Sequence, residues 1–151
     1  MRPLADEESL DLVLELGAET TVRADVQRLR QIIINLLSNA IKYTERGTVT
    51  VRSFRNGAGV VYEVQDTGAG ISPADMPKVF TAFEQTDVAK RRLDSTGLGL
   101  PVSLGMATAM NGTLEAVSLG IGHGSTFRLT LEPGNGGDTE LRMAALPLVA
   151  T

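Results

Sequence analysis

The sequence contains no cysteine and no tryptophan, and aromatic residues make up only 4% of its 151 positions. The lack of cysteine excludes a disulfide framework and a thiolate metal site. The scarcity of aromatic residues argues against a platform on which single-stranded nucleic acid would stack. No apolar run reaches the roughly 18 residues that a membrane span requires, and the first residues lack the pattern of a signal peptide.

Charge of one sign does not dominate either. Fourteen Lys and Arg residues stand against 18 Asp and Glu residues, for a net charge of −4. This balance argues against binding to the phosphates of nucleic acid. A hydrophobic content of 42% suits one compact domain. We therefore expect a cytoplasmic segment that contacts neither nucleic acid nor a membrane, although the full-length protein could still be membrane-anchored.

Periodicity and turn residues predict, in chain order, a strand, a helix, a hairpin, a short helix, a loop, a second helix and a second hairpin. The first strand covers residues 9–16, the first helix 25–43, and the first hairpin 48–54 with 60–66. The short helix starts at 72, the loop covers 80–96, the second helix 100–110, and the second hairpin 113–117 with 125–131. The boundaries rest on four signals. They are an Asp25 cap, an Asn56-Gly57 turn, a Ser72-Pro73 start with Asp75 completing the cap, and an Asn111-Gly112 stop.

Two hairpins imply mainly antiparallel pairing, and two main helices can cover only one face of a sheet. The predicted fold class is therefore α+β, a two-layer α/β sandwich with a mainly antiparallel mixed sheet and helices on one face. Residues 1–133 are expected to form this domain. Residues 134–151 begin with GNGGDTE and end in a short apolar tail, which predicts a linker and a tail.

The first long helix carries polar residues where a core helix would not. Asn35, Asn39 and Lys42 cluster within about 60° on one side of its apolar stripe. A solvated face is one interpretation. However, asparagine is a mediocre helix former, amide oxygens are good ligands for a hard metal ion, and an ammonium group neutralises phosphate. A cation with attached phosphates would satisfy all three side chains.

The stretch DTGAGI directly follows the third predicted strand, residues 60–66. Alternation places Asp66 on the face of the apolar residues 60, 62 and 64, toward the helical layer, where its carboxylate needs donors. An adenine amino group would be one, and Gly68 and Gly70 would let the backbone approach a flat ring. One alternative is a tight turn that needs two glycines. The other is a dinucleotide fingerprint, whose third position here is Pro73.

Two more glycine clusters follow. In STGLGLP, Gly97 and Gly99 present backbone N–H groups at a helix start, where an anion is favoured, and no Walker motif is formed. In GHGSTF, the only histidine, His123, lies in a loop rather than on a helix beside an acid. We interpret it as a surface residue and not as a phosphate acceptor.

Taken in order, NLLSNAIKYT, DTGAGI, FTAFEQ, TGLGLPVS and GHGSTF resemble five boxes of the catalytic ATP-binding domain of sensor histidine kinases. These are the N box, the first glycine box, the F box, and the second and third glycine boxes. The domain belongs to the GHKL superfamily, with the gyrase, mismatch-repair and chaperone ATPases. The resemblance covers roughly residues 4–133 and implies a Bergerat-type fold with a mobile ATP lid. The Phe-Glu-Gln ending of the F box is most similar to that of hybrid-type kinases. Ser95 and Pro101 depart from the usual glycine and alanine of the second glycine box.

The resemblance implies that ATP and Mg²⁺ are the cofactors. Asn39 and Lys42 would be the catalytic residues. Asn39, helped by Asn35, would ligate Mg²⁺, Lys42 would neutralise phosphate, Tyr43 would line the nucleotide, and Asp66 would accept from the adenine amino group. The other implied ATP-binding residues are Gly68, Gly70, Ile71, Arg91, Arg92, Thr96, Gly97, Leu98, Gly99, Leu100 and Ser125. Ser125 is preferred to Thr126 because it shares a strand face with apolar residues, although both hydroxyls could instead be structural.

The implied reaction is transfer of the ATP γ-phosphoryl group to a histidine on a dimerisation domain that this chain does not contain. A response regulator or receiver domain would act downstream. The alternatives are a regulatory nucleotide-binding module and an anti-sigma-type serine kinase of the same fold. The isolated chain is expected to bind ATP but scarcely to hydrolyse it, because Asn35 occupies the place of the acid that activates water in the related ATPases.

Overall fold

The computed structural model describes residues 10–17, 25–57, 59–81 and 99–133. The elements of this part follow the predicted order. They are β1 (Leu10–Leu16), α2 (Val26–Lys42), β2 (Gly47–Asn56), β3 (Gly59–Asp66), the 3-10 turn η1 (Met76–Lys78), α4 (Gly99–Ala109), β4 (Thr113–Val117) and β5 (Ser125–Leu131). No helix within these ranges is both long and apolar enough to cross a bilayer.

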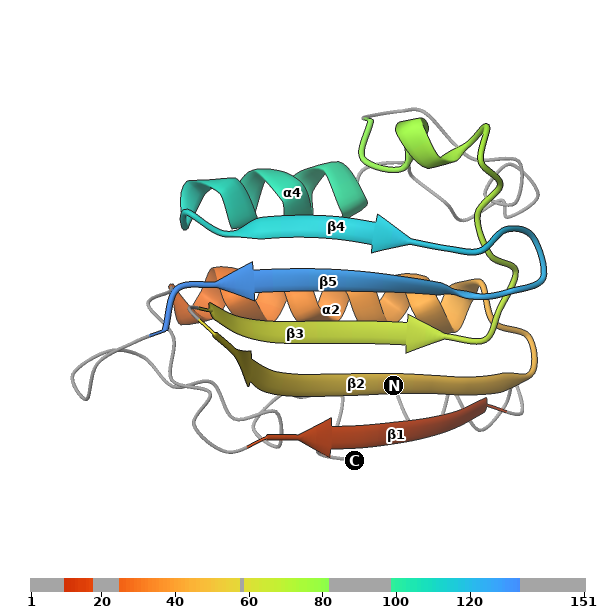
Figure 1. Cartoon of the computed structure of the whole chain (residues 1–151), viewed down its shortest axis with the longest axis horizontal. Coiled ribbons are helices and arrows are strands. Elements are labelled where there is room, and N and C mark those ends of the chain that lie inside the picture. Colours follow the sequence, from red (N-terminus) through yellow and green to blue (C-terminus); the bar gives the residue numbers. More distant parts are fainter. Residues whose placement is uncertain (1–9, 18–24, 58, 82–98, 134–151) are drawn as a thin grey trace.

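The five strands form one sheet in the order β1-β2-β3-β5-β4. Only β1 and β2 pair in parallel, with α2 between them along the chain, and the other three pairs are antiparallel. Figure 1 shows α2 behind the sheet and α4 alongside β4. The predicted two-layer sandwich with a mainly antiparallel mixed sheet is thus confirmed.

The core lies between α2 and the sheet. The predicted stripe of α2 is buried, because Leu29, Ile33, Leu36 and Ala40 are each at most 1% exposed. The facing side chains of the sheet are buried to the same degree, and they are Val51, Tyr62, Val64, Phe127 and Leu129. Burial of large apolar side chains such as these contributes about 1.5–3 kcal/mol each.

Both predicted caps of the main helices are observed. Asp25 caps α2, where its Oδ1 accepts from the backbone N–H of Gln27 at 2.9 Å and of Arg28 at 3.2 Å. After α4, Asn111 takes a left-handed conformation with φ of +57°. The Gly112 N–H then returns to the carbonyl oxygen of Ala107 at 2.8 Å. These local signals therefore determine where α2 begins and where α4 ends.

Two local predictions are wrong in detail. Asn56 is the last residue of β2 and pairs with Gly59, so the hairpin loop begins one residue later, at Gly57. The short helix does not start at Ser72-Pro73 but forms a single 3-10 turn from Met76. Pro77 explains this difference, because it has no N–H to donate to the carbonyl group four residues earlier. The Ser72 hydroxyl still accepts from the Asp75 N–H, at 3.1 Å.

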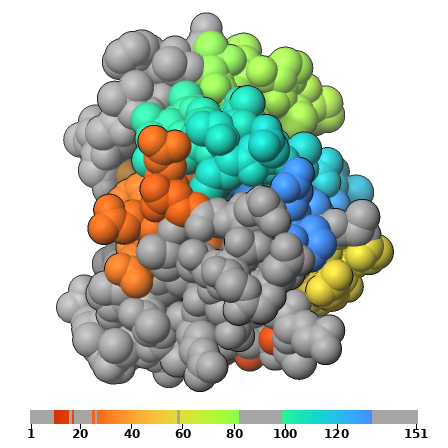
Figure 2. Space-filling view, turned by 90° about the vertical axis from the view of Figure 1, so that its left-hand side faces the viewer, coloured from red at the N-terminus to blue at the C-terminus, as the bar shows by residue number. Residues whose placement is uncertain are grey.

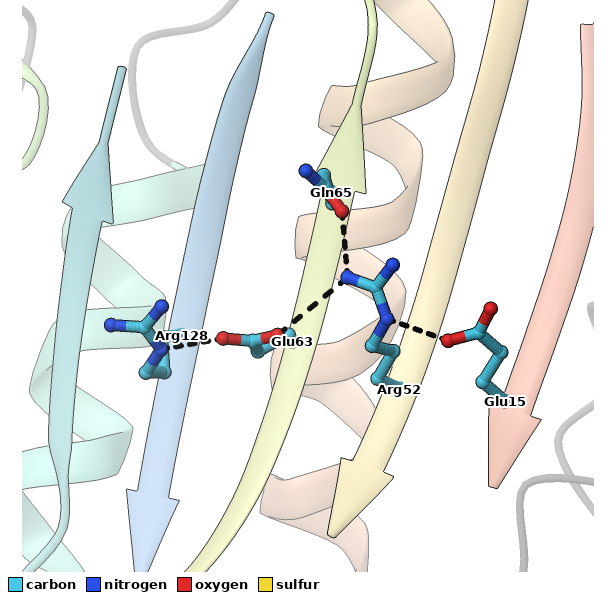
Figure 3. A network of polar contacts seen from close by, with 5 residues as sticks. All are labelled: Glu15, Arg52, Glu63, Gln65 and Arg128. Atoms are coloured by element: carbon cyan, nitrogen blue, oxygen red, sulfur yellow. Dashed lines mark hydrogen bonds and ion pairs between the residues drawn. The ribbon is translucent and has the colours of Figure 1, made fainter. Parts of the chain in front are cut away.

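The face of the sheet opposite α2 carries a row of alternating charges, called here the charge ladder. Its members, one from each strand, are Glu15, Arg52, Glu63, Arg128 and Glu115. Figure 3 shows four of them together with Gln65. Glu63 lies at the centre, 2.6 Å from Arg128 Nε and 3.8 Å from Arg52 Nη1. Opposite charges that face each other across strands stabilise pairing in this register.

Candidate functional site

The end of β3 presents a buried carboxylate to the helical layer, as alternation predicts. Asp66 is only 4% exposed. Its Oδ1 accepts from the N–H of Gly68 at 2.9 Å and from the N–H of Ser125 at 3.2 Å. Its Oδ2 accepts from the Ser125 hydroxyl at 2.8 Å. None of these donors is charged, and a carboxylate has about four acceptor positions, so Oδ2 keeps capacity for a further donor.

Burial governs the acid–base behaviour of this carboxyl group. Desolvation raises the pKa of Asp66 above its ordinary value of 3.8, and the hydrogen bonds from Gly68 and Ser125 only partly oppose it. A carboxylate held in a dry position without a cationic partner has a free-energy cost. Groups with such a perturbation occur often at binding sites, which makes Asp66 the strongest candidate in the described part of the chain.

The glycine clusters bring two loops into contact beside Asp66. The Gly122 N–H donates to the Ala69 carbonyl at 2.8 Å, and the Ala69 N–H donates to the Tyr43 carbonyl at 3.1 Å. A Cβ at Gly70, whose φ is +77°, would collide with the Gly120 carbonyl oxygen. A Cβ at Gly68 would lie 2.6 Å from Thr44 Oγ1. Both glycines are thus required by protein packing, whatever they allow a ligand to do.

Three of the predicted residues follow one another along the second half of α2. Asn39, Lys42 and Tyr43 are all half-buried. Tyr43 ends the helix, and its N–H donates to the Asn39 carbonyl at 3.1 Å. Among the described residues, no hydrogen-bond partner is found for the side-chain amide of Asn39. This amide therefore remains available to a ligand.

Asn35, one turn earlier, makes contact with α4. Its Nδ2 donates to the Ser103 hydroxyl at 3.1 Å and to the Gly99 carbonyl at 3.4 Å. Its Oδ1 accepts from Gln31 Nε2 at 2.8 Å. Figure 2 shows the first turns of α2, in orange, beside α4, in teal. Asn35 is thus already involved in joining the two helices.

The predicted residues form a line rather than a single cluster. The Asp66 loop meets α2 at Tyr43, and α4 meets it at Asn35, eight residues earlier. Eight residues of helix span about 12 Å. This length is comparable with that of an extended nucleoside triphosphate. The arrangement places Asp66 and the loop that follows it beside the C-terminal end of α2, and the start of α4 beside the middle of α2.

The remaining predicted residues have separate outcomes. Ile71 is 9% exposed, and its N–H donates to the Ser118 hydroxyl at 3.0 Å. Leu100 packs in the first turn of α4 against the core. His123 is exposed in the β4–β5 loop. The loop predicted over 80–96 falls outside the described residues except at 80 and 81, as do the residues Arg91, Arg92, Thr96, Gly97 and Leu98 and the tail 134–151.

Sequence reasoning did not identify three residues that organise the site. Ser118 opens the β4–β5 loop, and its hydroxyl donates to the Gly124 carbonyl at 2.7 Å while accepting from Ile71. Gln31 and Ser103 hold the two ends of the Asn35 amide. A serine before two closely spaced glycines is a signal that could indicate Ser118. The spacing of four between Gln31 and Asn35 could indicate their contact.

Comparison with known proteins agrees with this geometry. The family described as "Histidine kinase-, DNA gyrase B-, and HSP90-like ATPase" matches residues 24–135, more than half of the chain. The circadian input-output histidine kinase CikA of Synechococcus elongatus is 43% identical over 123 residues, which are 78% of this chain and 16% of that protein. The sensor histidine kinase MtrB of Mycobacterium tuberculosis is 37% identical over 130 residues, which are 85% of this chain and 23% of that protein. The chain therefore spans less than a quarter of either relative.

Solved structures show the same likeness. Full-length ShkA in complex with AMPPNP superposes with a TM-score of 0.75 at 31% identity, over 94% of this chain and 29% of that one. The histidine kinase AdeS of Acinetobacter baumannii gives a TM-score of 0.70 at 28% identity, over 89% of this chain and 59% of that one. With the family match and the geometry of Asp66 and α2, these comparisons show that the chain belongs to the family of histidine kinase-, DNA gyrase B- and HSP90-like ATPases.

Proposed function

We propose that this chain is the catalytic ATP-binding part of a larger sensor histidine kinase, one that transfers the γ-phosphoryl group of ATP to a histidine on a separate dimerisation domain. The observation that carries this proposal is Asp66, a buried carboxylate whose hydrogen-bond donors among the described residues are all uncharged. The named relatives support it, because they are sensor histidine kinases. A response regulator or receiver domain would accept the phosphoryl group afterwards.

Asp66 reads the base in this proposal. Its Oδ2 accepts from the exocyclic amino group of adenine, and Ser125 holds the carboxylate through the hydroxyl hydrogen bond of 2.8 Å. Guanine carries a carbonyl oxygen at the matching position, which would face the carboxylate with acceptor against acceptor. Tyr43, Gly68, Gly70 and Ile71 line the same end of the site. The resulting preference for adenine follows from hydrogen-bond complementarity.

The donor set beside Asn39 fits Mg²⁺. This ion usually takes one or two protein oxygens, with the remaining ligands supplied by phosphates and water. The described residues include no group of three or more His, Asp or Glu side chains that could hold a metal ion alone. Asn39 would supply one amide oxygen, and Asn35 Oδ1 a second if the metal displaced Gln31 from it. Bound there, Mg²⁺ would neutralise charge on the phosphates.

Lys42 and the start of α4 complete the phosphate end of the proposed site. Lys42 lies on α2 three residues after Asn39 and contributes positive charge. Gly99 and Leu100 offer backbone N–H groups in the first turn of α4, whose dipole favours an anion. Arg91, Arg92, Thr96, Gly97 and Leu98 remain predictions for this end. Catalysis by these groups would consist of positioning and charge neutralisation.

The test supplies the missing acceptor. The chain is mixed with a dimerisation domain that bears the phosphate-accepting histidine and with ATP labelled at the γ-phosphate. The expected product is a phosphohistidine, which acid destroys and base spares. A base-labile phosphoserine would instead indicate a serine kinase of the same fold. Binding of ATP without any transfer would indicate a regulatory module.

Without an acceptor, the chain should bind ATP but turn it over poorly. Asn35 cannot act as a general base, and its amide contacts Ser103 and Gln31. Steady hydrolysis at even about 1 s⁻¹, the low end of typical enzymes, would contradict this expectation. Phosphate release by the purified chain measures it, and a Lys42→Ala variant controls for a contaminating ATPase.

A further inference from the structure

The side-chain amide of Asn35 lies in the middle of a chain of hydrogen bonds from α2 to α4. Asn35 Nδ2 donates to Ser103 Oγ at 3.1 Å and to the Gly99 carbonyl at 3.4 Å. The Ser103 hydroxyl itself donates to that carbonyl at 2.9 Å. Ser103 is fully buried, at 0% exposure. A buried hydroxyl held on both sides is a specific feature, since an unpaired one would be costly.

The hydrogen-bond partners on α4 determine whether the nitrogen or the oxygen of the Asn35 amide faces that helix. A backbone carbonyl can only accept, and the Ser103 hydroxyl uses its one hydrogen on that carbonyl. Both groups therefore require a donor, and only the amide nitrogen of Asn35 can supply it. Its oxygen must then face outward, where the exposed Gln31 donates to it at 2.8 Å. The nitrogen is committed to α4, while the oxygen can exchange its partner.

We propose that Asn35 and Ser103 are positioning residues that set the first turn of α4 relative to Asn39. This inference rests on the proposed function, in which that turn and Asn39 bind the two sides of the same phosphates. The hydrogen bonds of Asn35 Nδ2 to Ser103 and Gly99 are called here the link. The link fixes the carbonyl of Gly99, the first residue of α4. It thereby orients the backbone N–H groups of the same turn. If a cation displaced Gln31 from Asn35 Oδ1, the hydrogen bonds of Asn35 Nδ2 to α4 would remain.

A second hydroxyl on α4 shows what is special about Ser103. Thr108 Oγ1 donates to the Leu104 carbonyl at 2.9 Å, which is the same bond to the carbonyl four residues earlier. Thr108 is exposed, and its hydroxyl makes no hydrogen bond to the described residues of α2. Ser103 differs by its contact with Asn35. Thr108→Ala is therefore a matched control for Ser103→Ala, because both delete a hydroxyl from one helix and only one breaks the link.

The first measurement compares ligands with and without phosphates, by calorimetry on the whole chain. Ser103→Ala should weaken binding of ATP with Mg²⁺ about three- to tenfold, the equivalent of one or two net hydrogen bonds. It should leave the affinity for adenosine unchanged, because adenosine contacts only the Asp66 end. Thr108→Ala should change neither affinity. Equal loss for ATP and adenosine in Ser103→Ala would indicate general damage and would overturn a positioning role.

The second measurement is a double-mutant cycle with Asn35→Ala, Ser103→Ala and both together. If Asn35 acts through Ser103, its substitution should weaken ATP binding less in the Ser103→Ala background than in the wild type. If Asn35 acted only as a metal ligand, the factor would be the same in both backgrounds, and multiplicative losses would overturn the proposal.

A third measurement needs no nucleotide. Hydrogen exchange of the amides from 99 to 104 should accelerate in Ser103→Ala and remain as in the wild type in Thr108→Ala. Unchanged exchange in Ser103→Ala would show that the link does not hold the turn, which overturns the inference. Failure of the wild-type chain to bind ATP would instead overturn the proposed function, and the exchange experiment would still decide whether the link exists.

Discussion

Asp66 and Glu63 are two acidic residues of β3 that lie on opposite faces of the sheet. Both are almost fully buried, at 4% and 8% exposure. Glu63 lies between Arg52 and Arg128, and its hydrogen bond is the main cause of a raised pKa of Arg128. Among the described residues, the donors to Asp66 are two backbone N–H groups and one hydroxyl. The neighbouring groups thus neutralise one charge and leave the other intact.

We interpret this difference as one between a structural carboxylate, Glu63, and the carboxylate of the proposed binding site, Asp66. The charge of Glu63 is neutralised within the sheet by two ion pairs, which join the central strand to its two neighbours. The carboxylate of Asp66 forms no ion pair within the described part of the chain, and burial raises its pKa. Functional sites commonly contain groups that, like this buried carboxylate, lower the stability of the fold. We therefore expect substitutions of Asp66 to affect ligands and substitutions of Glu63 to affect the fold.

The largest expected effect is that of Asp66→Asn on nucleotide binding. The amide keeps the shape of the carboxylate but removes its charge, and it can present a donor to the amino group of adenine. ATP affinity should fall roughly ten- to a hundred-and-fifty-fold, since a charge-assisted hydrogen bond contributes about 1.5–3 kcal/mol. Calorimetry measures this, and circular dichroism checks the fold. Asn39→Ala is the matched comparison, because it should weaken only the Mg²⁺-dependent part of binding and keep the preference for adenine.

The second effect is that of Glu63→Gln on stability. The substitution leaves two guanidinium groups without their shared carboxylate, but these groups are about one third exposed and partly solvated. The free energy of unfolding should fall by about 1–2 kcal/mol. Urea denaturation should show a lower midpoint with an unchanged slope. ATP affinity should stay within about twofold of the wild type, and a larger loss would mean that the two faces are not independent.

The third effect concerns pH. The raised pKa of Asp66 means that the folded chain holds this proton at pH values where the unfolded chain, at about 3.8, has already released it. The contribution of Asp66 to stability therefore decreases as the pH rises from about 3.8 through the raised pKa, and Asp66→Asn should lack this decrease. Urea denaturation of both proteins at a series of pH values measures the difference. An identical pH dependence in the two proteins would contradict the assigned cause.

The smallest effect is expected at the outer end of the charge ladder. Glu15 contacts Arg52 at 2.6 Å, but its side chain is 55% exposed on an edge strand. Glu15→Gln should change the free energy of unfolding by no more than about 0.5 kcal/mol. Comparison of its denaturation midpoint with that of Glu63→Gln shows whether the charge ladder stabilises the fold through its buried member or through ion pairing in general. Equal losses in both variants would favour ion pairing alone.

Much of the fold could be predicted because its signals are local. Asp25 and Asn111 determine helix ends through their own hydrogen bonds and backbone angles. Strand alternation places Asp66 on the helical face without any knowledge of the strand neighbours. The 3-10 turn at Met76 could not be predicted from its capping pattern alone, because Pro77 acts five residues after Ser72.

The less predictable features depend on contacts between distant segments. Asn35 and Ser103 are 68 positions apart, and no periodicity within either helix indicates that they meet. The charge ladder likewise requires the register of all five strands, which only the assembled sheet determines. Gly68 and Gly70 are a related case. Their spacing suggests a ligand loop, but the structure shows that the packing of neighbouring backbone already requires glycine at both positions.

If Asp66 gives this chain a site for adenine nucleotides, the chain must distinguish ATP from GTP. The wild-type chain is titrated with ATP and with GTP in the same Mg²⁺ buffer, and heat or intrinsic tyrosine fluorescence is followed. We expect saturable binding of ATP and an affinity for GTP that is lower by about tenfold or more. Equal affinity for the two nucleotides, or no binding of ATP at all, would contradict it.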